Sequence, residues 1–180
     1  MLPFVLHTPV YLWGFMGCGK SSLGRSLAQQ WDIPLYETDA LVEELVGESI
    51  PSIFQKQGEL AFRHYEREVL YSIPTNTSAI VATGGGLPCF EDNAQWMRLN
   101  GFTIYLSLSY EELSARLERS STKRPLLQGK QGVELRILVE ELLLQRELIY
   151  RRAHLAIDAN LASPEYLKNL FSRYELFTAL

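Results

Sequence analysis

Residues 10–21 read VYLWGFMGCGKS, and this stretch decides the fold. The first four residues form an uninterrupted apolar run, which is typical of a strand buried on both faces of a sheet. Three glycines follow within six residues, and the segment 20–31 then carries apolar residues at helical spacing. A buried strand that turns through glycines into a helix begins a parallel β-α-β unit. We therefore expect an α/β fold built on a parallel sheet.

Residues 14–21 also fit the pattern G-x-x-x-x-G-K-[ST], which is known as a P-loop. Its backbone N–H groups can surround phosphate oxygens, and the following helix adds the partial positive charge of its N-terminus. Lys20 is expected to reach the β- and γ-phosphates, and the Ser21 hydroxyl to ligate Mg²⁺. The sequence predicts that a nucleoside triphosphate is bound by Gly17, Cys18, Gly19, Lys20, Ser21 and Ser22. The alternative is a glycine-rich turn without a ligand.

Outward from this stretch, short apolar runs alternate with helical patterns. Further strands are expected at residues 34–36, 78–83, 103–106 and 155–157. Helices are expected at residues 40–46, 52–57, 60–71, 93–99, 110–118, 134–152 and 164–174. This alternation predicts helices on both faces of the sheet, with ligands at the carboxyl ends of its strands. The 180 residues are expected to form a single domain, 1–180.

The composition excludes several classes of protein. The net charge of −4 argues against a general nucleic-acid or membrane-surface binder, which needs a basic excess. No apolar run approaches membrane-spanning length, and residues 1–8 lack the basic region of a signal peptide. Cys18 and Cys89 show no zinc or disulfide pattern. We expect a cytoplasmic protein with no nucleic-acid or membrane partner, and nothing in the sequence demands more than a monomer.

Two carboxylates flank Thr38 just after the second predicted strand. In an extended segment, residues two apart point the same way, so Glu37 and Asp39 are expected to face the phosphates together. Glu37 could hold Mg²⁺ through water, and Asp39 could orient a substrate hydroxyl or accept its proton. The alternative is a solvated loop end in which Asp39 caps a helix.

Arg63 and Glu66 lie three residues apart on a predicted helix and share a face. From spacing alone, an exposed ion pair worth about 0.3 kcal/mol is favoured. The alternative is a buried arginine, held by Glu66, that presents its planar donors to a substrate carboxylate. The glycine triplet, Gly84–Gly86, follows a buried strand and is expected to be a substrate platform rather than a flexible turn.

The segment Arg119–Gly132 is polar, carries four basic residues and has no acid. It is expected to be a lid that closes over the triphosphate and places Arg124 against developing phosphate charge. The alternative is a solvated surface loop. On the following helix, Arg146 could serve as a second anion clamp.

In this order, these motifs closely resemble the shikimate kinase family over roughly residues 10–172. The matching residues are GFMGCGKS at 14–21, the acid-x-acid segment 37–39, Phe62-Arg63 with Glu66, Ala82-Thr83-Gly84-Gly85-Gly86, Arg124-Pro125-Leu126-Leu127, and Arg146 with Tyr150. The resemblance implies a three-layer fold like that of nucleoside monophosphate kinases, with a five-stranded parallel sheet in the order 2-3-1-4-5. It also implies transfer of the γ-phosphoryl of ATP to the 3-hydroxyl of shikimate with Mg²⁺, in chorismate and aromatic amino acid biosynthesis.

The resemblance also implies roles for individual residues. The catalytic residues would be Lys20, Asp39 and Arg124. Shikimate would be bound by Asp39, Arg63, Gly84, Gly85, Gly86 and Arg146, with the two arginines on its carboxylate. ATP would be held by the P-loop, Arg119 and Arg124, with Arg119 in the place of an adenine-stacking arginine. The metal would be held by Ser21 and, through water, by Glu37.

The implied division is a core at about 10–118 and 134–174, substrate-binding helices at about 38–72 and a lid at about 119–132. Two departures from the family pattern stand out. Glu37 stands where the family normally has aspartate, and residues 158–162 lack the basic residue that many relatives place near the adenine. The competing functions are a kinase for another small acceptor, such as gluconate or a nucleoside monophosphate, and a nucleotide-binding module without catalysis.

Overall fold

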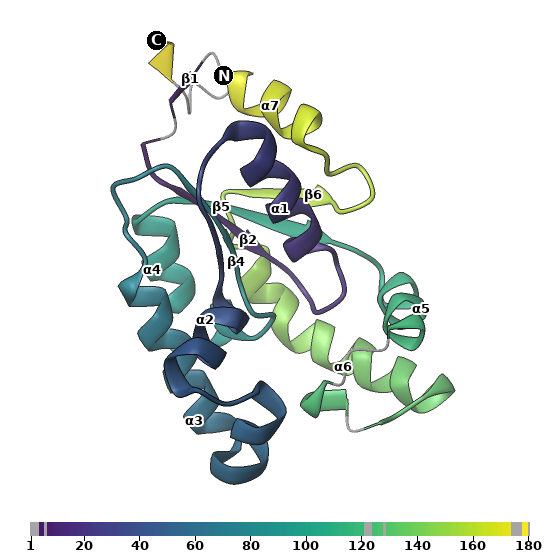
Figure 1. Cartoon of the computed structure of the whole chain (residues 1–180). Coiled ribbons are helices and arrows are strands. Elements are labelled where there is room, and N and C mark those ends of the chain that lie inside the picture. The colour runs from purple at the N-terminus through teal and green to yellow at the C-terminus, as the bar shows by residue number, and fades with distance from the viewer. Residues whose placement is uncertain (1–3, 6, 121–123, 128, 174–177, 180) are drawn as a thin grey trace.

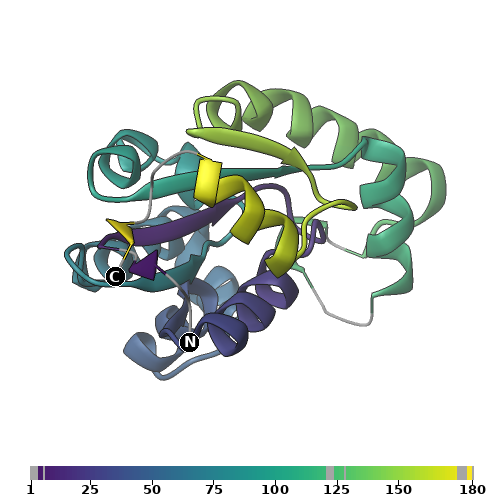
Figure 2. The same cartoon turned by 90° about the horizontal axis from the view of Figure 1, so that it is seen from above.

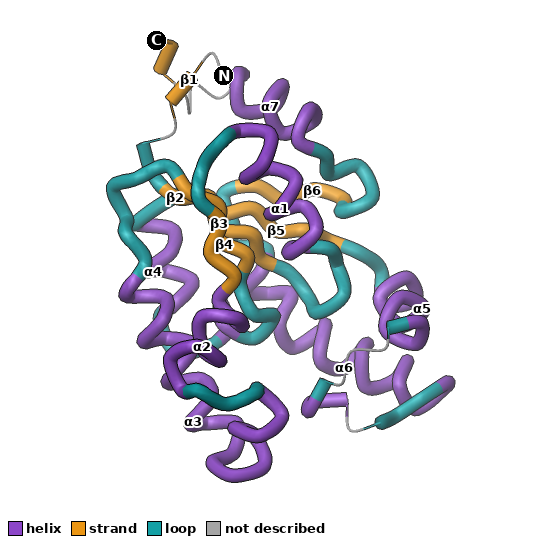
Figure 3. Tube along the Cα trace, viewed as in Figure 1, coloured by secondary structure: helices purple, strands orange, loops and turns teal. Residues whose placement is uncertain are grey.

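A five-stranded sheet lies at the centre of the molecule, and all of its neighbouring strands are parallel (Figures 1 and 3). The computed structural model describes residues 4–5, 7–120, 124–127, 129–173 and 178–179. The strands are β2 (Pro9–Trp13), β3 (Leu35–Glu37), β4 (Ala79–Ala82), β5 (Phe102–Ser107) and β6 (Leu155–Asp158). Their order in space is β3-β4-β2-β5-β6. Numbered within the sheet this is 2-3-1-4-5, so the predicted topology is confirmed.

The helices follow the predicted alternation. They are α1 (Lys20–Trp31), α2 (Thr38–Val46), α3 (Ile50–Ser72), α4 (Asn93–Leu99), α5 (Tyr110–Arg119), α6 (Gly132–Tyr150) and α7 (Pro164–Arg173), with the short 3₁₀ helices η1 (Leu87–Cys89) and η2 (Pro125–Leu127). A small antiparallel pair, β1 (Phe4–Val5) with β7 (Thr178–Ala179), was not predicted. Parts of the predicted lid, residues 121–123 and 128, and the last residue of the predicted closing helix, 174, lie outside the described residues.

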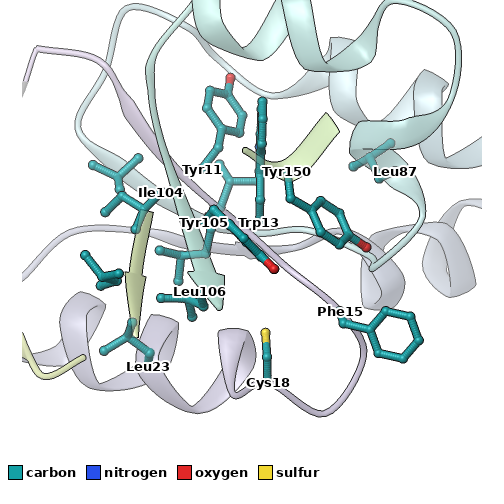
Figure 4. Close-up of a cluster of buried hydrophobic side chains, with 14 of the residues drawn as sticks. Tyr11, Trp13, Phe15, Cys18, Leu23, Leu87, Ile104, Tyr105, Leu106 and Tyr150 are labelled. Atoms are coloured by element: carbon teal, nitrogen blue, oxygen red, sulfur yellow. The ribbon is translucent and has the colours of Figure 1, made fainter. Parts of the chain in front are cut away.

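Alternation along the strands distributes the helices over the two faces of the sheet. Trp13 and Tyr105 are register partners and therefore share a face. Trp13 contacts Met97 of α4, and Tyr105 packs on Tyr150 of α6, so these two helices cover one face (Figure 2). Their side chains are part of the large buried cluster of Figure 4, which continues through the sheet to Leu23 of α1 on the other face.

The opposite face carries α1 and α7. Gly24 of α1 lies close to the sheet. A methyl group added at this glycine would be only 3.6 Å from side-chain atoms of Ile80 and Ala82. The helices α1 and α7 also pack on each other through Trp31 and Phe171, whose ring centroids are 5.8 Å apart. The chain therefore forms the three layers that were predicted.

Helices α2 and α3 follow the carboxyl end of β3 and lie beside each other (Figure 1). They enclose a smaller apolar cluster of Val42, Ile53, Phe62 and Val69. The predicted break in α3 is confirmed at Gly58, whose φ of 83° and ψ of 173° are not helical. Within the described ranges, no helix is both long and apolar enough to cross a membrane.

Candidate active site

A cavity of about 680 Å³ lies where the loops after β2, β3 and β4 come together. Its volume suits a small-molecule site. Of the predicted site residues, it is lined by Gly17, Gly19, Lys20, Ser21, Ser22, Asp39, Arg63, Gly85, Gly86, Arg124 and Arg146. Cys18 and Gly84 are buried beside the lining residues, whereas Glu37 and Arg119 do not contribute to it. The sequence therefore identified most of the wall of one cavity.

The P-loop forms one side of this cavity. Gly19 has a φ of 107°, a left-handed conformation that favours glycine, and it caps the N-terminus of α1. The Lys20 ammonium donates hydrogen bonds to the carbonyl oxygens of Gly14, at 2.8 Å, and Phe15, at 2.9 Å. These contacts hold the positive charge of Lys20 over the loop, next to the N-terminus of α1. The lysine charge and the helix N-terminus both favour the binding of an anionic phosphate.

Asp39 faces the P-loop across the cavity from the first turn of α2. Its side chain is open to the cavity, but protein surrounds the cavity, and this enclosure raises the pKa of the Asp39 carboxyl above its usual value. The positive charges of Lys20, Arg124 and Arg63 act in the opposite direction. A carboxyl placed in this way can accept a hydrogen bond or a proton from a hydroxyl.

Arg63 is buried, with 7% of its surface exposed, and three of its N–H directions are fixed by glutamates. Its Nη1 donates to Glu66 at 2.5 Å, while its Nε and Nη2 donate to Glu59 at 3.2 and 2.7 Å. The exposed pair favoured by spacing alone is therefore wrong, because packing of α3 against the cavity buries Glu66 completely. Burial raises the pKa of Glu66 to about 7, although Arg63 opposes the shift.

Arg146 and Arg124 bring two further positive charges to the cavity. The Arg146 guanidinium lies over the ring of Phe15, 5.6 Å from its centroid. Its Nη1 and the Nε of Arg124 are buried and make no hydrogen bond with any residue that the structure describes. Because buried donors without partners are costly, these groups are suited to an anionic ligand in the cavity.

The glycine triplet forms the floor between these charges. A Cβ on Gly84 would collide with Glu66 and lie 2.6 Å from Oδ1 of Asp39. A Cβ on Gly86 would lie 2.5 Å from the guanidinium carbon of Arg63. Side chains are excluded here because charged groups of the site pack directly on the backbone.

The comparison with known protein families decides the family. Residues 16–175 match the family model described as "Shikimate kinase". This match includes all of the described residues that line the cavity. The chain belongs to the shikimate kinase family.

Individual members of the family resemble this chain over most of its length. The curated shikimate kinase of Parabacteroides distasonis is 39% identical over 150 residues, which are 83% of this chain and 87% of the relative. The crystal structure of shikimate kinase from Bacteroides thetaiotaomicron has a TM-score of 0.83 and 31% identity, covering 92% of this chain and 98% of that one. The structure of shikimate kinase from Acinetobacter baumannii in complex with shikimate has a TM-score of 0.82 and 32% identity, covering 94% and 93%.

Glu37 departs from the expected geometry as well as from the family pattern. Its carboxylate accepts hydrogen bonds from Nη1 of Arg25 at 2.9 and 3.0 Å. The prediction that Glu37 and Asp39 face the phosphates together is wrong for this arrangement, because α2 begins at Thr38 and the segment is not extended beyond Glu37. In the helical turn the two side chains diverge.

The residues of the cavity fit Mg²⁺ in the way that P-loop proteins bind it. Ser21 lines the cavity with a hydroxyl oxygen at the start of α1. Among the described residues, no three His, Cys, Asp or Glu side chains gather as a metal cluster. Mg²⁺ commonly takes few protein ligands and completes its shell with water and substrate phosphates, so one hydroxyl beside a triphosphate site suits it.

An arginine that the sequence did not single out contacts the P-loop from outside the lining of the cavity. Arg116 of α5 donates to the carbonyl oxygen of Cys18 at 3.4 Å and to Asn160 at 2.7 Å. Arg119, the predicted adenine partner, is exposed at the end of the same helix. Leu117 fixes this register because it packs beside Gly17 of the P-loop. Sequence spacing before Arg124 does not show which of Arg116 and Arg119 contacts the P-loop; the packing of α5 brings Arg116 to it.

Proposed function

We propose that this protein is a shikimate kinase, which transfers the γ-phosphoryl of ATP to the 3-hydroxyl of shikimate. Family membership supports an ATP-dependent kinase with an alcohol acceptor. The observation that carries the proposal is that one cavity has a P-loop on one side and two buried arginines, Arg63 and Arg146, near its glycine floor. Two arginines beside a bare backbone suit the carboxylate of a small acceptor.

On the donor side, the P-loop N–H groups and Lys20 would bind the phosphates of ATP. Arg124 would add charge against the transferring phosphoryl group, where its buried Nε has no partner among the described residues. Ser21 would ligate Mg²⁺, with Glu37 through water once it leaves Arg25. When bound, Mg²⁺ supplies neutralisation of phosphate charge. Arg116, rather than Arg119, would lie against the adenine.

On the acceptor side, Arg63 and Arg146 would bind the shikimate carboxylate. The N–H groups of the glycine triplet and the Asp39 carboxylate would bind the polar groups of the ring. Asp39 would orient the 3-hydroxyl and accept its proton. The raised pKa of Asp39 brings its basicity closer to that needed for proton transfer near neutral pH. Most of the rate enhancement would come from alignment and charge, because phosphoryl transfer requires little covalent chemistry.

We further propose a monomer that works in the cytoplasm without nucleic-acid or membrane partners. Both cysteines are free, as expected in a reducing compartment. Sedimentation of the purified protein tests the monomer: a single species at about 20.5 kDa is expected, and a dimer mass would refute it.

The function is tested by mixing the purified protein with ATP, Mg²⁺ and a panel of acceptors. ADP release is expected with shikimate and only at background with gluconate or a nucleoside monophosphate. Turnover of another panel member instead of shikimate would name a different acceptor. Folded protein that binds ATP and releases no ADP with any acceptor would support the non-catalytic module.

A further inference from the structure

Two of the carbonyl groups of the glycine triplet are held by the turn that follows it. The carbonyl oxygen of Gly84 accepts from the N–H of Leu87 at 3.2 Å, and that of Gly86 accepts from the N–H of Cys89 at 2.9 Å. These bonds close η1 and fix the end of the platform. The N–H of Gly84 and the carbonyl of Gly85 take no part in these bonds, so their hydrogen-bond partners must come from other parts of the chain.

Two side-chain hydroxyls provide these partners from different directions. The N–H of Gly84 donates to Oγ1 of Thr38 at 2.7 Å. The hydroxyl of Tyr150 donates to the carbonyl oxygen of Gly85. Both side chains are completely buried, so neither hydroxyl can be replaced by bulk water without rearrangement.

The remaining polar groups of the platform are the N–H groups of Gly85 and Gly86. Neither makes a hydrogen bond with any described residue, and both glycines line the cavity. The carbonyl of Gly85 and the N–H of Gly86 belong to one planar trans peptide, so they point in opposite directions. A hydroxyl that holds the carbonyl on one side therefore fixes the N–H on the other side.

Each hydroxyl is also coupled to an acceptor-side residue along the chain. Thr38 directly precedes Asp39 in the first turn of α2. Tyr150 lies one helical turn after Arg146 in α6, so the two side chains share a face. The hydroxyls thus tie the glycine floor to the two elements that carry the Asp39 carboxylate and the Arg146 guanidinium.

We propose that Thr38 and Tyr150 are positioning residues, whose hydroxyls hold the glycine triplet so that the N–H groups of Gly85 and Gly86 are presented to the acceptor. The inference rests on the proposed function, because it assumes that the acceptor lies on this floor. Glycine peptides rotate with little steric resistance, so without these anchors the floor would sample several orientations. The anchors limit that freedom before the acceptor binds.

The test compares Tyr150→Phe and Thr38→Val with the wild type. Each removes one hydroxyl and nearly preserves the shape of the side chain. The KM for shikimate is expected to rise about tenfold, as for the loss of one well-placed hydrogen bond. The kcat and the KM for ATP are expected to stay within about threefold, because neither hydroxyl touches the phosphates. Thr38→Ser restores a hydroxyl and is expected to restore the shikimate KM.

Tyr11→Phe is the matched control. The Tyr11 hydroxyl is also buried but makes no hydrogen bond with a described residue, and it points away from that of Tyr150 in Figure 4. This variant is expected to keep the wild-type shikimate KM. A lower thermal midpoint with an unchanged shikimate KM in both Tyr150→Phe and Thr38→Val would overturn the inference, because it would show a structural role alone. Wild-type protein without shikimate turnover would instead refute the proposed function, so the two failures are distinguishable.

Discussion

The donor side and the acceptor side of the cavity are built in different ways. The core of the proposed donor side is one continuous segment, 14–22, which offers its backbone, one lysine and a helix N-terminus to the phosphates. The acceptor side is assembled from side chains on α2, α3 and α6 and from the loop after β4. One side is therefore local in sequence, and the other exists only after the chain has folded.

This difference affects how charge is handled. On the donor side, Lys20 is satisfied by carbonyl oxygens of its own loop. On the acceptor side, Arg63 requires Glu59 and Glu66, and the buried Glu66 in turn has a raised pKa. We therefore expect loss of Lys20 to affect mainly the chemical step, loss of Arg146 to affect mainly the affinity for shikimate, and loss of Glu66 to affect stability.

The largest effect is expected for Lys20→Met. This change removes the positive charge that Lys20 is proposed to place beside the phosphates. The kcat is expected to fall about 1000-fold, which is the scale seen when charge stabilisation of a transition state is lost. Steady-state ADP release measures it, with shikimate binding followed separately by calorimetry. An unchanged affinity for shikimate would support the separation of the donor side from the acceptor side. A kcat near that of the wild type would contradict the role of Lys20 in the chemical step.

The second effect belongs to the acceptor side alone. Arg146→Ala removes one clamp on the carboxylate, and the KM for shikimate is expected to rise about 100-fold, because charge-assisted hydrogen bonds are lost. The KM for ATP should stay within about threefold of the wild type. An equal loss of ATP affinity would show that Arg146 does not belong to the acceptor side.

The third effect concerns pH and stability without ligand. The pKa of Glu66 is raised from 4.5 to about 7 in the folded protein, so the folded state holds this proton more tightly than the unfolded chain. The stabilisation is complete below about pH 4.5 and is lost as the pH rises through about 7. Between about pH 5 and pH 7.5, the wild type should lose roughly 1–3 kcal/mol more than Glu66→Gln. Urea unfolding at both pH values measures this difference in the free energy of unfolding. An equal change with pH in the wild type and in Glu66→Gln would contradict the raised pKa of Glu66.

The smallest effect compares two arginines near the P-loop. Arg116→Ala should raise the KM for ATP about fivefold, because this side chain contacts the loop, as for a single exposed contact. Arg119→Ala should change it less than about twofold. Shikimate KM is the internal reference and should not move in either variant. The reverse order for ATP would restore Arg119 as the adenine partner.

The same division explains what could be predicted from the sequence. The P-loop, the sheet order and the break at Gly58 were predicted, because each depends on local pattern or on the family motifs. The burial of the Arg63–Glu66 pair could not be derived from spacing, since an i, i+3 pair looks the same on an exposed helix. The divergence of Glu37 from Asp39 depends on a helix that begins two residues earlier than its pattern indicates.

The hydroxyls that hold the glycine floor show the same limit. Tyr150 was part of the family motif, but its partner on Gly85 lies 65 residues away in the chain. Thr38 was treated only as the residue between two carboxylates. Contacts over such separations depend on the packed sheet and leave no periodic signal along the sequence.

The central claim is that the two sides of the cavity bring ATP and shikimate together for transfer. It is tested most directly by NMR of the product formed from shikimate, ATP and Mg²⁺ by the wild-type protein. The account predicts one phosphorylated product, with ³¹P coupling to the proton at carbon 3 and one ADP formed for each shikimate consumed. Phosphate released from ATP while shikimate stays unmodified, or phosphorylation at another ring hydroxyl, would contradict it.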